Sequence, residues 1–197
     1  MRTIDRIQYA ANLARGKRVL DIGGHKMPGC DPASSFAKAY KHINNAAGEY
    51  RIVDCQLSPE VDYHIDLNKR ASIDAIRKVL DDYKPEVILC METLEHVNYH
   101  YECMNQMAYA VRRYQSVVFV TIPNNGNWIF NALGWNRDHC VAFYRGIAHR
   151  FIMRSDLGGH DVESLACMQK YLWYWWMAYG LALGQPFCWG FVIRPKQ

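Results

Sequence analysis

Acidic residues at the ends of apolar segments are the first candidates for chemistry in this sequence. Asp21 stands in the segment RVLDIGG and is followed by Gly23 and Gly24, while Asp54 and Asp66 follow later apolar segments. A carboxylate at the end of a buried strand can accept hydrogen bonds from ribose hydroxyls, and glycines let the backbone approach a ligand closely. The pattern predicts a nucleotide-type binding loop. A helix cap or a surface turn is the alternative for each aspartate taken alone.

Two histidines could supply a general base. His96 lies in METLEHV, after the fourth apolar segment, and His139 lies in RDHCVAFYRG, after the fifth. Neutral imidazole can take a proton at physiological pH, so both suit proton removal from a bound substrate. The alternatives are that His96 braces the helix it begins and that His139 packs a loop. Asp138 and Tyr144 are further candidates.

The segments that would position these residues indicate a parallel α/β sheet. Apolar runs rich in valine and isoleucine predict strands at Arg18–Ile22, Tyr50–Asp54, Val61–Ile65, Glu86–Met91 and Ser116–Ile122. Apolar residues at helical spacing predict crossover helices over Ser72–Tyr83 and Tyr99–Tyr114. Parallel strands share one carboxyl edge, which is where open α/β sheets bind ligands.

Three further elements are predicted outside this central part. A short helix over Ile4–Leu13 precedes the first strand, and Asp161 could cap a helix that Gly180 ends. The segment Phe187–Ile193 closes the chain as a strand. Because there is no internal repeat and no second core, residues 1–197 are predicted to form a single domain.

Taken together, the motifs resemble those of the class I S-adenosylmethionine-dependent methyltransferases, in the subgroup whose fourth strand leads into ExLEHV. VLDIGG, HIDL, ETLEHV and VTIPN occur in the family's order within Lys17–Asn125. The resemblance implies an α/β fold: a seven-stranded, mostly parallel Rossmann-like sheet with helices on both faces. Its last strand would be antiparallel, and Phe187–Ile193 would be that strand.

The resemblance also implies a cofactor, S-adenosylmethionine, with S-adenosylhomocysteine as its product, and the residues that would bind it. These are Asp21, Gly23 and Gly24 for the methionine part, Asp54 for the ribose hydroxyls, Asp66 and Leu67 for adenine, and Met91 and Glu92 for the sulfonium end. Each role fits the chemistry, because carboxylates and carbonyl groups accept hydrogen bonds from hydroxyl and amino groups and favour a positive charge.

The first loop departs from the family's pattern. His25 stands where a further glycine is usual, and Gly29 comes only later. The interval from Asp21 to Asp54 is longer than the roughly 20 residues of a dinucleotide-binding unit, which indicates an inserted segment around Asp31–Asn45. The rival enzyme class, an NAD-dependent reductase, needs the turn G-x-G-x-x-G, and His25 takes the place of its second glycine.

The composition fits an ordinary soluble domain. The chain has 197 residues and a formal net charge of +4, which demands neither a nucleic acid nor a membrane as partner. Its seven cysteines have no zinc-finger spacing, so reduced thiols and no metal site are predicted. No secretory signal is recognised at the N-terminus, so a cytoplasmic location is expected. Tyr171–Ile193 carries no charge, but its glycines and Pro186 predict a helix and a buried hairpin rather than a membrane span.

The resemblance leaves the methyl acceptor open. We expect a small or medium metabolite, methylated at oxygen or nitrogen in an aromatic-lined site built from Trp128, Trp135 and the C-terminal tryptophans. RNA is the alternative acceptor, because a basic run is interleaved with aromatic rings; it consists of Tyr144, Arg145, His149, Arg150, Phe151 and Arg154. A catalytically silent relative that binds a protein partner is a further alternative. The sequence predicts no particular oligomeric state.

Overall fold

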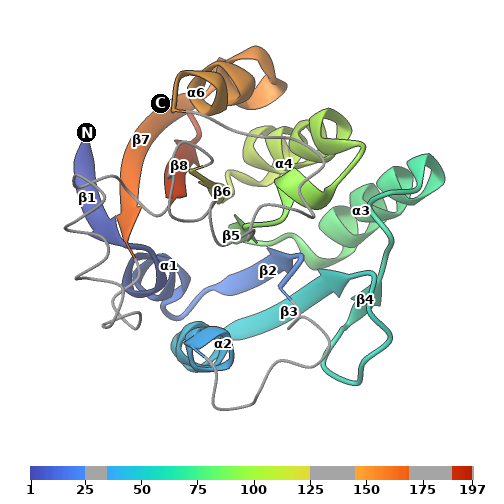
Figure 1. Cartoon of the computed structure of the whole chain (residues 1–197). Coiled ribbons are helices and arrows are strands. Elements are labelled where there is room, and N and C mark those ends of the chain that lie inside the picture. Colours follow the sequence, from blue (N-terminus) through green and yellow to red (C-terminus); the bar gives the residue numbers. More distant parts are fainter. Residues whose placement is uncertain (25–34, 125–144, 169–187, 197) are drawn as a thin grey trace, which may run out of the picture.

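A mostly parallel sheet forms the centre of the fold (Figure 1). The computed structural model describes residues 1–24, 35–124, 145–168 and 188–196. In these residues the sheet has eight strands in the order β1-β7-β8-β6-β5-β2-β3-β4. Only β8 runs antiparallel to its described neighbours, β6 and β7. The strands are β1 Arg2–Asp5, β2 Arg18–Ile22, β3 Glu49–Asp54, β4 Tyr63–His64, β5 Val87–Met91, β6 Val117–Pro123, β7 Asp161–Met168 and β8 Cys188–Arg194.

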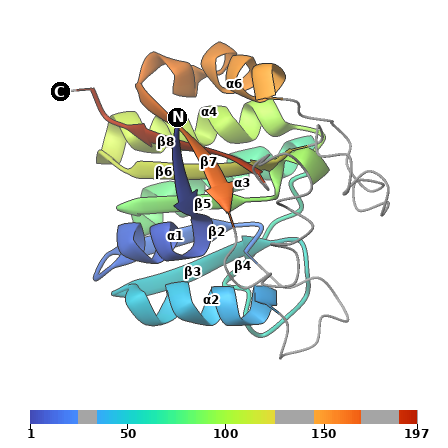
Figure 2. The same cartoon turned by 60° about the vertical axis from the view of Figure 1, so that its left-hand side comes forward.

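Helices cover both faces of the sheet, α1 and α2 on one and α3, α4 and α6 on the other (Figures 1 and 2). The buried side chains follow the same division: Ile7 and Ile43 belong to one cluster, and Met107 and Ile152 belong to the other. Burial of one such side chain contributes about 1.5–3 kcal/mol, so the two apolar layers hold the sheet between them. The helices are α1 Arg6–Ala14, α2 Ser35–Ala46, α3 Arg70–Tyr83, α4 His100–Tyr114 and α6 Arg145–Arg154, with 3-10 turns η1 Leu94–His96 and η2 Asp156–Gly159.

The central part of the fold confirms the predicted strands and crossover helices. β2 has the predicted bounds, and β3, β5 and β6 each differ from prediction by one residue at one or both ends. These strands are recognisable because both of their faces are covered by helices, which places apolar side chains on both faces. The interval expected to hold an inserted segment, Asp31–Asn45, contains most of α2, which connects β2 to β3.

The sheet has eight strands rather than the seven expected, because the N-terminal segment adds an edge strand. β1 pairs in parallel with β7, with Arg2 opposite Leu165. The helix predicted over Ile4–Leu13 therefore begins later, at Arg6. Asp5 sets this boundary, since its side chain accepts hydrogen bonds from the backbone N–H groups two and three residues ahead, both at 3.0 Å.

The segment that starts at Asp161 is a strand, which corrects the predicted helix. β7 pairs with β8 on one side and with β1 on the other. Leu165 and Cys167 are buried on the α1 side, whereas Val162 packs against the opposite cluster, and this alternation is that of a strand. The apolar spacing fits either element, and the two partner strands decide between them. The remainder of the predicted helix, up to Gly180, lies outside the described residues.

Gly190 in β8 lies where no side chain fits. A Cβ atom on it would overlap the Sγ atom of Cys167 and press on the Phe119 ring. We expect Gly190→Ala to destabilise the protein by about 1–3 kcal/mol, the usual effect of overpacking, in a urea denaturation experiment. Cys167→Ala removes the overlapping sulfur, so the double variant should recover part of the loss. Unchanged stability of the single variant would contradict this packing.

The uncharged stretch Tyr171–Ile193 is only partly described. Residues 188–193 lie in β8, and the rest of the stretch lies outside the described residues. No helix in the described parts of the chain has both the length and the apolar character needed to cross a membrane. The described cysteines are free thiols, and Cys30 and Cys140 lie outside the described residues.

Candidate functional site

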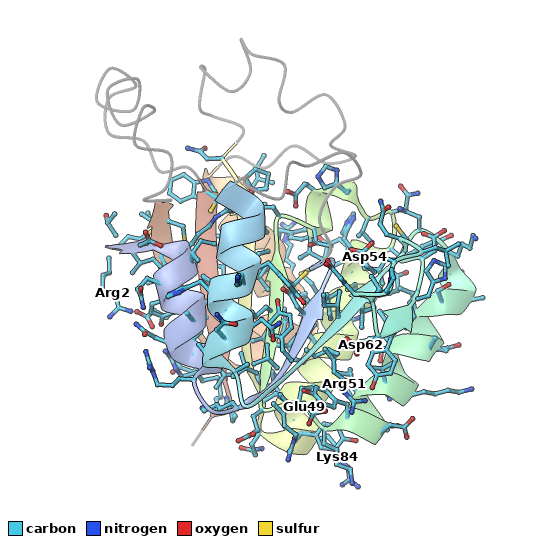
Figure 3. All side chains as sticks on the ribbon, turned by 90° about the horizontal axis from the view of Figure 1, so that it is seen from below. Arg2, Glu49, Arg51, Asp54, Asp62 and Lys84 are labelled. Atoms are coloured by element: carbon cyan, nitrogen blue, oxygen red, sulfur yellow. The ribbon has the colours of Figure 1, made fainter. Side chains whose placement is uncertain are left out.

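The carboxyl ends of three adjacent strands, β5, β2 and β3, bring the predicted acidic residues to one edge of the sheet. Asp21 is the fourth residue of β2, Asp54 is the last residue of β3, and Glu92 directly follows β5. Figure 3 shows Asp54 and Glu49 at opposite ends of β3. The candidate site is therefore at the edge where open α/β sheets bind ligands.

The glycine turn after β2 packs directly against the turn after β5. Gly23 has a φ of 77°, and its N–H donates to the Val53 carbonyl at 2.8 Å. A Cβ atom on Gly23 would overlap the side chain of Thr93, and one on Gly24 would overlap the carboxyl group of Asp21. The absence of side chains at Gly23 and Gly24 thus lets Thr93 and the carboxyl group of Asp21 pack closely against this turn. His25 lies outside the described residues.

Asp21 is a buried carboxyl group whose charge is poorly stabilised. Its side chain accepts a hydrogen bond from the hydroxyl of Tyr50, and the residue is 4% exposed. Burial, with a smaller contribution from the charge of Asp54, raises the pKa of Asp21 to about 7, although the Tyr50 hydrogen bond opposes the shift. A bound cation would favour the ionised form. Tyr50 was not singled out from the sequence, where it is only the first residue of the predicted strand Tyr50–Asp54.

Asp54 is fixed at the end of β3 by the chain that follows it. Its Oδ1 atom accepts a hydrogen bond from the backbone N–H of Gln56 at 2.9 Å, and its carbonyl accepts one from Ile65 at 2.9 Å. The residue is buried. These backbone contacts hold the carboxylate in one orientation, as recognition of a pair of hydroxyl groups requires.

Asp66 and Leu67 lie in the turn between β4 and α3. The Oδ1 atom of Asp66 accepts a hydrogen bond from the N–H of Asn68 at 3.0 Å, and its Oδ2 atom lies 3.4 Å from Lys69 Nζ. Leu67 is buried in the core with α3 and α4. Asp66 therefore makes the contact of a surface turn, which was the alternative role for it. Its contact with adenine stays a prediction.

Glu92 adopts an unusual backbone conformation at the end of β5, after the partly buried Met91. Among the described non-glycine residues with positive φ, Lys84 and Gln115 are helix C-caps, and the third is Glu92, with a φ of 53°. Its N–H donates to the carbonyl of Thr121 at 3.0 Å. Backbone strain of this kind is retained where the surroundings enforce it, as at binding sites.

The side chain of Glu92 is held by two donors. Thr121 Oγ1 donates to Glu92 Oε1 at 2.9 Å, and Arg6 Nη1 lies 3.1 Å from the same oxygen. Arg6 is the first residue of α1 and is 2% exposed. Sequence reasoning missed Arg6, because nothing in the local pattern relates it to a residue so far along the chain.

The turn η1 contributes a second buried carboxyl group, Glu95, and the predicted base His96. Glu95 is 1% exposed, and neither of its carboxyl oxygens has a hydrogen-bond partner among the described residues. Burial, together with the charge of Glu92, raises the pKa of Glu95 well above its ordinary value. The Nε2 atom of His96 is 3.9 Å from Glu95 Oε1, and the imidazole is partly exposed. Glu95 belongs to the motif ETLEHV but was not singled out from the sequence.

Other predicted residues do not enter the described site. His139, Asp138, Tyr144, Trp128 and Trp135 lie outside the described residues, as do the tryptophans before β8. Trp189, the remaining C-terminal tryptophan, is buried in the core, and its part in an acceptor site stays a prediction. Within the described ranges, no group of three or more His, Cys, Asp or Glu side chains could hold a metal ion.

Comparisons with known proteins identify the fold. No protein-family model matches the sequence, and no curated protein sequence matches it either. The small RNA methyltransferase HEN1 is similar in structure, with a TM-score of 0.58 and 14% identity over 98% of this chain, which spans 25% of the length of that one.

Two further solved structures match over most of both chains. The S-adenosylmethionine-dependent methyltransferase from Mesorhizobium loti has a TM-score of 0.54 and 12% identity, covering 96% of this chain and 95% of that one. The N-methyltransferase NodS from Bradyrhizobium japonicum, in complex with S-adenosyl-L-homocysteine, has a TM-score of 0.53 and 11% identity, covering 98% and 86%. The chain has the Rossmann-like fold of the class I S-adenosylmethionine-dependent methyltransferases.

Proposed function

We propose that the protein is an S-adenosylmethionine-dependent methyltransferase, with residues 1–197 as one catalytic domain. The observation that carries the proposal is the set of three carboxylates, Asp21, Asp54 and Glu92, at the carboxyl ends of three adjacent strands in this fold. Fold alone does not specify an activity, but the chemistry of these three groups matches what the cofactor requires.

The described residues fit the cofactor. Asp21 is a buried carboxyl group whose raised pKa makes it a suitable partner for the ammonium of a methionine part. Asp54 has a fixed orientation in which it would accept both ribose hydroxyls. Met91 and Glu92 would line the sulfonium end, and Asp66 with Leu67 would meet adenine. When bound, S-adenosylmethionine supplies the methyl group that is transferred.

The protein's own part in the reaction is to align the acceptor and remove its proton. An in-line displacement with a good leaving group needs mainly positioning, and a hydroxyl or ammonium acceptor also needs a base. His139, in the chain that follows β6, is our first candidate, and His96 in η1 is the second. For the acceptor we propose a small or medium metabolite with an oxygen or nitrogen nucleophile.

RNA is a second candidate acceptor, favoured by the outer surface of α6. His149, Arg150 and Arg154 are exposed there. Tyr101 of α4 is 40% exposed, and its ring centroid lies 4.9 Å from that of Phe151 in α6. Cationic side chains beside an exposed aromatic ring suit contact with phosphates and bases. HEN1, named as a small RNA methyltransferase, shares the fold.

Asp54→Ala tests the cofactor site. The alanine would leave the ribose hydroxyls without their acceptor, so the affinity for S-adenosylhomocysteine should fall by about 5–150-fold, equivalent to about 1–3 kcal/mol. Isothermal titration calorimetry measures this. Asp82→Ala is the matched control, since Asp82 is exposed and lines a cavity with Arg18 and Glu49 at the opposite edge. Unchanged affinity in the Asp54 variant would remove Asp54 from the site, and no binding by the wild type would refute the proposed function.

A further inference from the structure

The ion pair between Arg6 and Glu92 is buried beside the candidate sulfonium end of the site. The side chain of Arg6 is 3% exposed and that of Glu92 is 20% exposed. Burial lowers the pKa of the Arg6 guanidinium, but Glu92 together with Cys188 and Cys167 more than offsets this, so the pKa lies above its ordinary value. Arg6 therefore carries a full positive charge next to a carboxylate that we place near the transferred methyl group.

The contacts of the N-terminal segment fix the position of Arg6. β1 is fixed to the sheet by β7, Asp5 caps the first turn of α1, and Ile7 packs in the core behind it. Arg6 thus lies at the fixed junction between β1 and α1, and its side chain reaches Glu92 at the carboxyl end of β5. β1 is the strand beyond the seven that the resemblance implies.

The groups around Arg6 leave Glu92 as its main anionic partner among the described residues. The guanidinium donates a hydrogen bond to Cys188 Sγ at 3.7 Å. Burial raises the pKa of the Cys188 thiol well above its ordinary value, so the thiol stays neutral. The pKa of Glu95 is likewise raised by its burial, so this carboxyl group favours its neutral form. The charge on Glu92 is therefore balanced by Arg6.

We propose that Arg6 is a positioning residue that, through Glu92, sets the preference of the site for S-adenosylmethionine over S-adenosylhomocysteine. This inference rests on the proposed function. The two ligands differ by a methyl group and by the positive charge on sulfur, so a nearby carboxylate favours the methyl donor over its product. Arg6 reduces that bias by compensating the carboxylate and holding it on Thr121. With its charge balanced, the site binds the donor less selectively over the product. The donor is therefore not overstabilised relative to the transition state.

Replacement of Arg6 by methionine removes the compensating charge. The ratio of affinities, S-adenosylmethionine over S-adenosylhomocysteine, should rise by about tenfold, as expected for one uncompensated charge a few ångströms from a cation. Glu92→Gln should lower the ratio below that of the wild type. Arg6→Lys keeps the charge and should leave the ratio close to the wild-type value. Titration calorimetry at pH 8.5, where carboxylates are ordinarily ionised, gives both affinities.

Arg2→Met is the matched control. Arg2 lies in the same N-terminal segment and pairs with Glu163 on the surface, so its loss changes the net charge equally but leaves Glu92 untouched. An affinity ratio that does not change in Arg6→Met, or that changes equally in Arg2→Met, would overturn the proposal. If neither ligand binds the wild type, the proposed function fails instead.

A second variant covers the case in which Arg6→Met does not fold, since breaking a buried ion pair is costly. The double variant Arg6→Met with Glu92→Gln removes both charges. If Arg6 and Glu92 compensate each other, the double variant, which lacks both charges, has an affinity ratio between those of the two single variants and close to that of the wild type. A ratio in the double variant as low as that of Glu92→Gln would show that the charge of Arg6 has no effect at the ligand and would overturn the proposal.

Discussion

Replacing Asp21 by asparagine is expected to stabilise the ligand-free protein by about 4 kcal/mol above pH 7 and to leave its stability unchanged near pH 4. Burial raises the pKa of Asp21 from 3.8 to about 7. Between these two values the folded wild type keeps a proton that the unfolded chain releases. The stabilising contribution of this group is therefore fully present at acid pH and is lost as the pH rises toward 7. Asparagine has no proton to lose.

Urea denaturation of the wild type and of Asp21→Asn across this pH range measures the difference. The free energy of unfolding of Asp21→Asn minus that of the wild type should rise with pH and reach a plateau above pH 7. Asp82→Asn is the control, because it makes the same chemical change at an exposed position of α3. A difference that does not vary with pH would contradict the burial of an isolated charge. Above pH 7, S-adenosylhomocysteine should stabilise the wild type more than the variant, since its ammonium can pair with the carboxylate.

Replacing His139 by glutamine is expected to lower turnover by about 10²–10⁴-fold and to leave the affinity for S-adenosylhomocysteine nearly unchanged. The chain after β6 leaves the sheet at the same edge as Asp54 and Glu92, and His139 follows in it. Glutamine keeps the polar character of the side chain but cannot accept a proton near neutral pH. A loss of turnover without a loss of binding is what removal of a general base produces.

The acceptor needed for this measurement can be found with the same protein. S-adenosylmethionine with a labelled methyl group is incubated with a cell extract, and the label is followed into small metabolites and into RNA. Label in metabolites supports the first proposal, label in RNA supports the second, and no transfer by a protein that binds the cofactor supports a catalytically silent relative. His96→Gln is the parallel variant: a loss of turnover in it alone would assign the base to His96.

The centre of the fold was predictable because its strands are buried on both faces. β2, β3, β5 and β6 carry buried apolar residues on both faces, and the helices between them show regular apolar spacing. The acidic residues at the strand ends follow directly from this order. Asp21 and Asp54 could thus be assigned to one edge of the sheet from sequence alone.

The antiparallel strand β8 lies within one residue of its predicted bounds at each end, but β1 and β7 were not predictable in the same way. β1 and β7 owe their conformation to each other and to β8, which lie far apart in sequence. The apolar residues of β7 are spaced as a helix also allows, so only its partners determine the outcome. The contacts of Arg6 with Glu92 and of Tyr50 with Asp21 depend on the same long-range packing.

The pairing of β1 with β7 also constrains the order in which the molecule can assemble. β1 is synthesised long before β7, so on the ribosome it has no strand to join until most of the chain has emerged. Contacts between such distant segments slow folding, because a long loop must close before they form. Until then β1 is an unpaired strand, and the charges of Arg2 and Asp5 at its two ends make it a poor template for aggregation. Since Arg6 follows directly on β1, the buried ion pair at the site lies beside this late-forming contact.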